Sequence, residues 1–261
     1  MMRSLYTATT GMTAQQTALD VISNNLANVS TTGFKKSTAE FHDLIYQTFR
    51  PAGAPRTSGI LPVGIQVGLG VQPMSAHKTF QQGNFEQTGN PFDMAINGDG
   101  FFQVTLPDGN TGYTRSGTFK LNNEGAVVST EGMLLLPSIT IPSGMAQIHI
   151  SPDGMVSGVA VGATTETIVG QIELARFANS AGLDALGKNL YQVTDASGGV
   201  LSGAPGKEGF GEIQHKYLEG SNVDIAVEMV RMIVAQRAYE LNSKAIQTSD
   251  EMLALVNSLK R

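Results

Sequence analysis

The chain has 261 residues, contains neither cysteine nor tryptophan, and carries a formal net charge of −5 from 17 Lys plus Arg and 22 Asp plus Glu. A mildly acidic chain without runs of basic residues is a poor candidate for coating nucleic acid or an anionic membrane. The lack of cysteine excludes disulfides, thiolate metal sites and cysteine nucleophiles.

The N-terminal segment, residues 1–35, is predicted to form a helix. It contains no proline, and its apolar residues recur at spacings of three and four, as on one face of a helix. We expect the helix to end near Gly33, after the turn-rich residues 28–32. Between Ser4 and Phe34 the only charge is Asp20, so the polar face is uncharged and is predicted to meet other protein. The apolar stripe consists of Leu5, Met12, Leu19, Ile22 and Leu26.

The same segment bears on targeting. The first 28 residues lack a basic stretch followed by a continuous apolar core, so we expect no conventional signal peptide. No run of 18 apolar residues occurs in the chain, so no transmembrane helix is predicted. If the protein leaves the cytoplasm, we expect another route to carry it.

The middle of the chain is predicted to be β-rich. It holds all ten prolines, from Pro51 to Pro205. Residues 36–75 are expected to form an extended connector, and residues 76–215 a β domain. Short apolar runs in the β domain are separated by turn sequences such as Asp-Gly-Asn at 108–110. Many short strands at this spacing favour an antiparallel sandwich or an irregular barrel.

The last segment, residues 216–261, is predicted to return as a second helix. Ser221 and Asp224 fit a capping box, and no proline or glycine follows Gly220. A helix over residues 222–259 would measure roughly 57 Å at 1.5 Å per residue, longer than the chain's own core can cover. The two ends are therefore expected to pair as a coiled coil that neighbouring subunits stabilise further. The second stripe consists of Val227, Val234, Leu241, Met252 and Leu255.

No catalytic, cofactor-binding or metal site is predicted. The four histidines, His42, His77, His149 and His215, lie far apart and share no motif with a carboxylate. Residues 182–189 match a phosphate-binding loop except at Asn189, where a Ser or Thr hydroxyl would ligate magnesium. The residues that follow read as a strand rather than the helix that such a loop needs, so we interpret this segment as an ordinary loop.

Both ends of the chain resemble the signatures of bacterial flagellar basal-body rod and hook proteins. The N-terminal match is NNLANVSTTGFK, residues 24–35, and the C-terminal match joins YLEGSNVD, residues 217–224, to MIVAQRAYE, residues 232–240. Within this family the length and residues 46–71 resemble the distal-rod type. The signature residues are Asn24, Asn25, Leu26, Ala27, Asn28, Gly33, Phe34, Ser221, Asn222 and Val223.

The resemblance implies a structural protein of the bacterial flagellum. Subunits of this family stack helically into a hollow shaft that transmits torque from the motor to the hook and carries exported subunits. It implies a location in the distal rod, which crosses the periplasm, and residues 46–71 would stiffen the contacts between subunits. It implies neither an enzyme nor a cofactor.

The resemblance also implies partners. They are further copies of the chain, proximal rod proteins, the hook protein, the ring proteins of the outer membrane and peptidoglycan, and the flagellar type III export gate. Nucleic acid and membrane insertion are not expected. Phe41 and Ile45 resemble the Phe-x-x-x-aliphatic motif of early export substrates, although buried packing would explain the same pair.

Two other interpretations stay open at this point. A proximal rod or hook subunit would carry the same signatures and differ only in its position in the organelle. An exported glycan-binding or hydrolytic β protein with helical appendages would instead be a stable monomer with a concave polar site.

Overall fold

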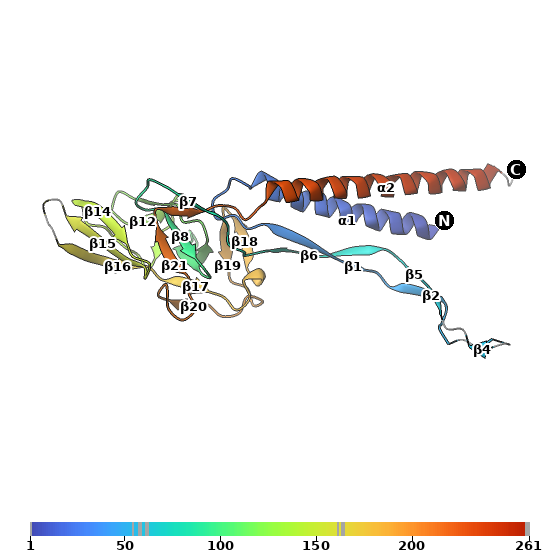
Figure 1. The fold of residues 1–261 in the computed structure, drawn as a ribbon, viewed down its shortest axis with the longest axis horizontal. Coiled ribbons are helices and arrows are strands. Elements are labelled where there is room, and N and C mark those ends of the chain that lie inside the picture. Colours follow the sequence, from blue (N-terminus) through green and yellow to red (C-terminus); the bar gives the residue numbers. More distant parts are fainter. Residues whose placement is uncertain are drawn as a thin grey trace. The chain divides into compact units, whose positions relative to one another are not determined.

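The structure is a computed structural model that describes residues 2–53, 55–56, 59–60, 63–160, 162 and 165–258. The chain forms two compact units, each built from segments that are distant in the sequence. Unit 1 comprises Met1–Ala27, Ser37–His77 and Asp224–Arg261, and unit 2 comprises Asn28–Lys36 and Lys78–Val223. Unit 2 thus includes residues 28–35 and 216–223, which lie in the predicted terminal-helix segments. The fold is mainly β with a helix near each end of the chain (Figure 1).

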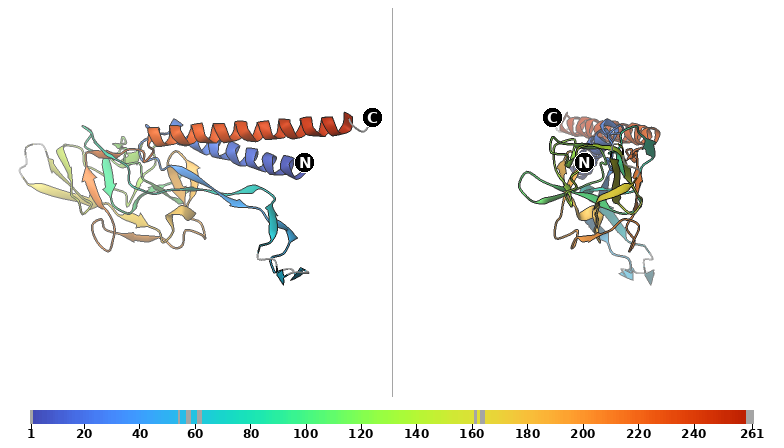
Figure 2. Two further views of the ribbon diagram at one scale, coloured as in Figure 1. Left: turned by 45° about the vertical axis from the view of Figure 1, so that its right-hand side comes forward. Right: turned by 90° about the vertical axis from the view of Figure 1, so that its left-hand side faces the viewer.

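Unit 1 contains both helices and a narrow β ribbon. The helices lie side by side, with the N- and C-termini at the same end of the pair (Figures 1 and 2). In the ribbon β1 pairs with β6, β2 with β5, and β3 with β4. The elements are α1 (Met2–Ala27), β1 (Ser37–Asp43), β2 (Tyr46–Arg50), β3 (Pro55–Arg56), β4 (Gly59–Ile60), β5 (Ile65–Gly68), β6 (Val71–Lys78) and α2 (Ile225–Ser258).

The helix ends differ from the predicted ones. Helix α1 ends at Ala27 rather than near Gly33, because the chain turns at Asn28, whose carbonyl accepts the Thr31 N–H at 3.1 Å. Helix α2 begins at Ile225. The carboxylate of Asp224 caps it by accepting the N–H groups of Ala226 and Val227, at 2.9 and 3.2 Å. The predicted capping box is therefore wrong in register. Leu259, the predicted last residue of the helix, lies outside the described residues.

Unit 2 is built on a seven-stranded antiparallel sheet in the order β18-β19-β10-β9-β17-β20, with β13 added beside β9. Smaller sheets pair β8 with β21, β7 with β22, β11 with β12, and the central strand β15 with both β14 and β16. A short 3₁₀ helix η1 (Ser180–Gly182) follows β17. The strands are β7 (Phe85–Gln87), β8 (Met94–Asn97), β9 (Phe101–Thr105), β10 (Thr111–Thr114), β11 (Phe119–Leu121), β12 (Val127–Ser129), β13 (Leu135–Leu136), β14 (Met145–Ile150), β15 (Met155–Ala160), β16 (Glu166–Gln171), β17 (Leu174–Arg176), β18 (Asp184–Gly187), β19 (Leu190–Gln192), β20 (Leu201–Gly203), β21 (Glu212–His215) and β22 (Tyr217–Glu219).

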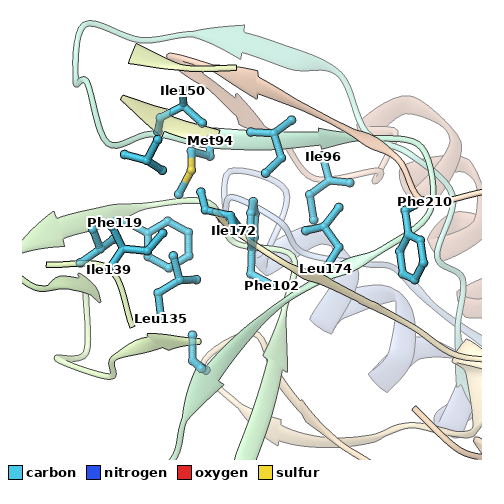
Figure 3. Close-up of a cluster of buried hydrophobic side chains, with 14 of the residues drawn as sticks. Met94, Ile96, Phe102, Phe119, Leu135, Ile139, Ile150, Ile172, Leu174 and Phe210 are labelled. Carbon is cyan, nitrogen blue, oxygen red and sulfur yellow. The ribbon is translucent and has the colours of Figure 1, made fainter. Parts of the chain in front are cut away.

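Two clusters of buried side chains hold unit 2 together. Successive side chains of a strand point to opposite faces, so Phe101 and Phe102 of β9 enter different clusters. Phe102 packs edge to face on Phe119 at 5.2 Å between ring centroids, within a largely aliphatic core (Figure 3). Phe101 joins an aromatic cluster with Phe177 and Tyr191.

Candidate functional site

The contact between α1 and α2 is made by small and polar side chains. Ser4 Oγ lies 3.4 Å from Ser249 Oγ. A Cβ added at Gly11 would lie 2.9 Å from the side-chain nitrogen of Asn242, so a larger residue at position 11 would require the Asn242 side chain to shift. The pairing runs antiparallel and repeats every seven residues. The row on α1 is Ser4, Gly11, Ala18 and Asn25, and the row on α2 is Glu228, Ala235, Asn242 and Ser249.

Asn25 and Glu228 form a buried polar pair at one end of this contact, each 1% exposed. Asn25 Nδ2 donates to Glu228 Oε2 at 3.4 Å, and Arg231 donates to the other Glu228 oxygen at 2.9 Å. Asn25 also exchanges two hydrogen bonds of 2.8 Å with the backbone of Ser37. A buried polar group that loses its partners costs about 1–3 kcal/mol, so Asn25 fixes the start of β1 beside α1.

The predicted apolar stripe of α2 does not face α1. Its side chains remain exposed, at 44% for Val227, 62% for Val234, 66% for Leu241, 47% for Met252 and 62% for Leu255. The expectation that this stripe pairs the two helices within the chain is wrong. The row of small and polar residues that does face α1 lies one residue further along, which is about 100° around the helix.

The stripe of α1 is covered more fully. Ile22 is buried at 8% exposure, whereas the other members, Leu5, Met12, Leu19 and Leu26, are half-buried. A second side of α1 contacts the turn before β6, where Thr10 accepts the N–H of Val71 at 3.4 Å. Helix α1 is therefore contacted from two sides, while the large apolar residues of α2 stay uncovered.

A groove of about 340 Å³ lies between α1, β1 and α2. Its walls include Ile22 from α1, Phe41 from β1, and Val230 and Val234 from α2. Phe41, which is 37% exposed, and Ile45, which is 81% exposed, are the residues of the predicted export motif. Neither side chain is buried within this chain.

A buried ionic cluster in unit 2 joins the segment that follows α1 in the sequence to the segment that precedes α2. Lys35 Nζ lies 2.6 Å from Glu219 Oε1, and both side chains are fully buried. Lys35 also donates to the carbonyl of Gln81 at 2.7 Å, and Glu219 Oε1 accepts the N–H of Gly83 at 2.9 Å. Arg115 lies 3.7 Å from Glu219 Oε2.

Burial dominates the electrostatics of this cluster. Loss of water lowers the pKa of Lys35 below its usual range, and the carboxylate of Glu219 opposes that shift. Burial likewise lowers the pKa of Arg115, again against the attraction of Glu219. Because one buried carboxylate serves two buried cations, loss of any one charge leaves the others poorly compensated.

The backbone beside this cluster requires specific residues. Gly33 has a φ of +71°, and a Cβ there would lie 2.7 Å from the backbone nitrogen of Ser116. Asn222 links its own segment to two others. Its Nδ2 donates to the carbonyls of Thr79 at 2.8 Å and Gln81 at 3.1 Å, and its Oδ1 accepts the N–H of Lys36 at 2.7 Å.

The structure places the signature residues in two settings. Gly33, Phe34, Asn222 and Val223 are buried or half-buried together in unit 2, where the Phe34 carbonyl accepts the N–H of Asn222 at 3.4 Å. Ser221 accepts the Val223 N–H at 3.3 Å. The remaining residues lie at the end of α1 or just after it, where Asn24 and Ala27 are exposed, Asn25 is buried, and Leu26 and Asn28 are half-buried.

Two features of the site were not predicted. The role of Lys35, Glu219 and Arg115 was not predicted from the sequence, although Lys35 is the only charged residue of the N-terminal signature, residues 24–35. The small-residue row of α1 repeats every seven residues as regularly as the apolar stripe does, and that repeat was the available signal for the helix contact.

The remaining sequence candidates have structural explanations. Lys188 and Asn189 have φ of 54° and 58° and form the turn of the β18–β19 hairpin, so a strand follows the lysine and the loop interpretation is confirmed. The rings of His149 and His215, distant in the sequence, lie 5.6 Å apart. Within the described ranges no group of three or more metal-binding side chains occurs, and no helix is long and apolar enough to span a membrane.

Three family models match separate parts of the chain. The model for the flagella basal body rod protein matches residues 5–35, and the model for the C-terminal region of flagellar basal body rod FlgEFG proteins matches residues 214–259. Between them, residues 95–158 match the model for the flagellar hook protein FlgE/F/G D1 domain. The matches therefore include both ends of the chain and part of unit 2.

Full-length relatives are also similar. The flagellar basal-body rod protein FlgG of Borreliella burgdorferi is 52% identical over 100% of both chains. FlgG of Buchnera aphidicola from Acyrthosiphon pisum is 49% identical over 99% of this chain and 100% of its own, and FlgG of Bacillus subtilis is 42% identical over 100% of both.

Proposed function

Since the chain belongs to the flagellar basal-body rod protein family and is a structural subunit of the distal rod rather than an enzyme, we propose that it joins further copies of itself through the apolar faces of its terminal helices. One observation carries this proposal. The contact inside the chain uses small and polar residues, while large apolar residues of α2 such as Leu241 and Leu255 remain more than half exposed.

The exposed stripe of α2 still has apolar surface to bury. Full burial of one Val, Leu or Met side chain stabilises by about 1.5–3 kcal/mol relative to exposure. Val234, Leu241 and Leu255 each have more than half of their surface still to bury. Seven-residue spacing suits coiled-coil packing between the helices of neighbouring subunits, with the half-buried Leu5, Met12, Leu19 and Leu26 of α1 as the complementary row.

The ribbon of unit 1 supports a second contact between subunits. A two-stranded ribbon is marginally stable by itself in water. Tyr46, Phe49 and Ile65 on β2 and β5 are each more than half exposed. We therefore propose that residues 46–71 lie against neighbouring subunits. These contacts would stiffen the rod and bury the apolar side chains that are exposed in a single chain.

We also propose a sandwich-like β body and further partners. The main sheet of unit 2 has a buried cluster on each face, because Phe101 and Phe102 of β9 enter different clusters. This arrangement is compatible with a sandwich-like β body. We propose proximal rod proteins, the hook protein and the ring proteins as further partners. The exposure of Phe41 and Ile45 leaves both side chains available to an export gate.

The test places a charge on the stripe. Leu241→Glu is expected to abolish rod assembly, because a carboxylate would be buried without a partner in every subunit contact. Gln247→Glu adds the same charge to the same helix outside the stripe and is the matched control. Each variant would be the only copy of the protein in motile cells, and isolated basal bodies would be examined by electron microscopy. Normal rods with Leu241→Glu would overturn the proposal.

A further inference from the structure

A cavity of about 410 Å³ in unit 2 lies over the aromatic cluster around Phe101. Its walls come from the start of β9, from β17 and the residues that follow it, and from Arg115. A volume of this size is typical of small-molecule sites, which combine apolar walls with a few polar groups. The residues that matter for its chemistry are Asp99, Phe101, Arg115, Arg176 and Phe177.

Arg115 is a buried cation with an incomplete set of partners. Its side chain is 3% exposed, and its terminal nitrogens donate to the carbonyls of Gly98 at 2.6 Å and Ile96 at 3.3 Å. Its Nε has no hydrogen-bond partner among the residues that the structure describes. The carboxylate of Glu219 is 3.7 Å away, and its nearer bond is the one to Lys35. An additional anion beside Arg115 would therefore offset part of the cost of burying this charge.

Arg176 supplies a second cation on the same wall. One of its terminal nitrogens donates to the carbonyls of Glu208 at 3.4 Å and Gly209 at 3.2 Å, and its guanidinium lies 5.7 Å from the ring centroid of Phe210. These contacts hold the guanidinium in place, while its remaining N–H groups stay available for a ligand. Asp99 is the only carboxylate among the described residues that line this cavity, so its wall carries two positive charges against one negative charge.

We propose that this cavity binds a small organic carboxylate. Arg115 and Arg176 would face the carboxylate, since guanidinium groups form strong charge-assisted hydrogen bonds with such groups. Phe101 and Phe177 would contact the carbon skeleton, and Asp99 would accept a hydrogen bond from a hydroxyl or N–H group of the same ligand. A sugar acid and an acidic peptide side chain both provide this chemistry. The proposal is independent of subunit assembly, because none of these residues belongs to the helix stripes.

The test compares pairs of probes that differ in one carboxylate. D-glucuronate is compared with D-glucose, and N-acetylglutamate α-amide with N-acetylglutamine amide, so that the two pairs also distinguish the two sources. The full chain, labelled with ¹⁵N, is titrated at constant ionic strength, which keeps general salt effects equal. Binding is followed at the backbone amides of Asp99, Gly100 and Ala178. Saturable shifts are expected with the carboxylate member of at least one pair and not with its neutral counterpart.

Three variants complete the experiment. Arg176→Gln is expected to raise the Kd at least tenfold. Arg237→Gln, which removes an exposed arginine from α2, should leave the Kd unchanged. Ala178→Phe fills the cavity while keeping both arginines, and it is expected to abolish the shifts even if Arg176→Gln disturbs folding. Equal shifts with the neutral probes, no saturable shift with either carboxylate, or an unchanged Kd in folded Ala178→Phe would overturn the proposal.

Discussion

Replacement of Lys35 by methionine tests whether the buried ionic cluster holds unit 2 together. Methionine keeps most of the side-chain volume and removes the charge and both hydrogen bonds, to Glu219 at 2.6 Å and to the Gln81 carbonyl at 2.7 Å. The carboxylate that remains is fully buried and keeps only the N–H of Gly83 and the more distant Arg115.

The expected loss follows from these contacts. Removal of one partner of a buried ion pair costs about 3–5 kcal/mol, because the other charge is left uncompensated. Arg115 still attracts the carboxylate, so we expect the lower end, about 3 kcal/mol. A typical domain has about 5–15 kcal/mol of stability in total, so this loss would be large.

The assay is urea unfolding of the full chain, followed by circular dichroism of the β signal at pH 7. Lys36→Met is the matched control, because it removes the neighbouring lysine, whose backbone N–H rather than its charge contacts Asn222. We expect the control to lie within about 0.5 kcal/mol of the unchanged protein. A loss below 1 kcal/mol for Lys35→Met, with the same slope against urea, would refute the assignment of the cluster as a stabilising element.

Two further predictions concern unit 2. Gly33→Ala should destabilise the folded chain by about 1–3 kcal/mol because of the positive φ alone, and by more because the new Cβ would lie 2.7 Å from a backbone nitrogen. The control Gly89→Ala, which has open space around it, should be nearly neutral in the same urea assay. Burial, with the nearby ring of His149, lowers the pKa of His215 in the folded chain. As the pH drops, the unfolded chain therefore binds a proton at His215 before the folded chain does, and the free energy of unfolding falls below about pH 6.5. His215→Gln should reduce the fall in melting temperature between pH 7.5 and pH 5, and an unchanged fall, equal to that of the exposed-site control His42→Gln, would contradict the assignment.

Several features could be predicted from the sequence because they depend on local rules. All ten prolines lie between Pro51 and Pro205, so long helices are possible only outside that region. Helices α1 and α2 do occupy those ends. The antiparallel strands of unit 2 follow from short alternating runs between turn residues, and the turn at Lys188 and Asn189 explains why a sequence resembling a phosphate loop is a hairpin.

Other features depended on tertiary contacts. Periodicity shows that a helix has an apolar face, but it does not say whether that face meets the same chain or another one. Leu241 illustrates this limit, because its row has ideal spacing and yet is exposed, while Ser249 and Asn242 face α1. Helices with glycine and serine at their contact can approach closely, so small side chains took the position that hydrophobicity alone would assign to leucine.

The sequence by itself determined the two terminal helices, the β-rich middle and, through its terminal signatures, the family. Only the tertiary structure decided that Lys35, Glu219 and Arg115 meet in one buried cluster, since residues 35, 115 and 219 are far apart along the chain. It also decided that the wall of a cavity carries two arginines against one aspartate. The physical reason is that helix formation and turns depend on neighbouring residues, whereas burial of a charge depends on which distant segments pack around it.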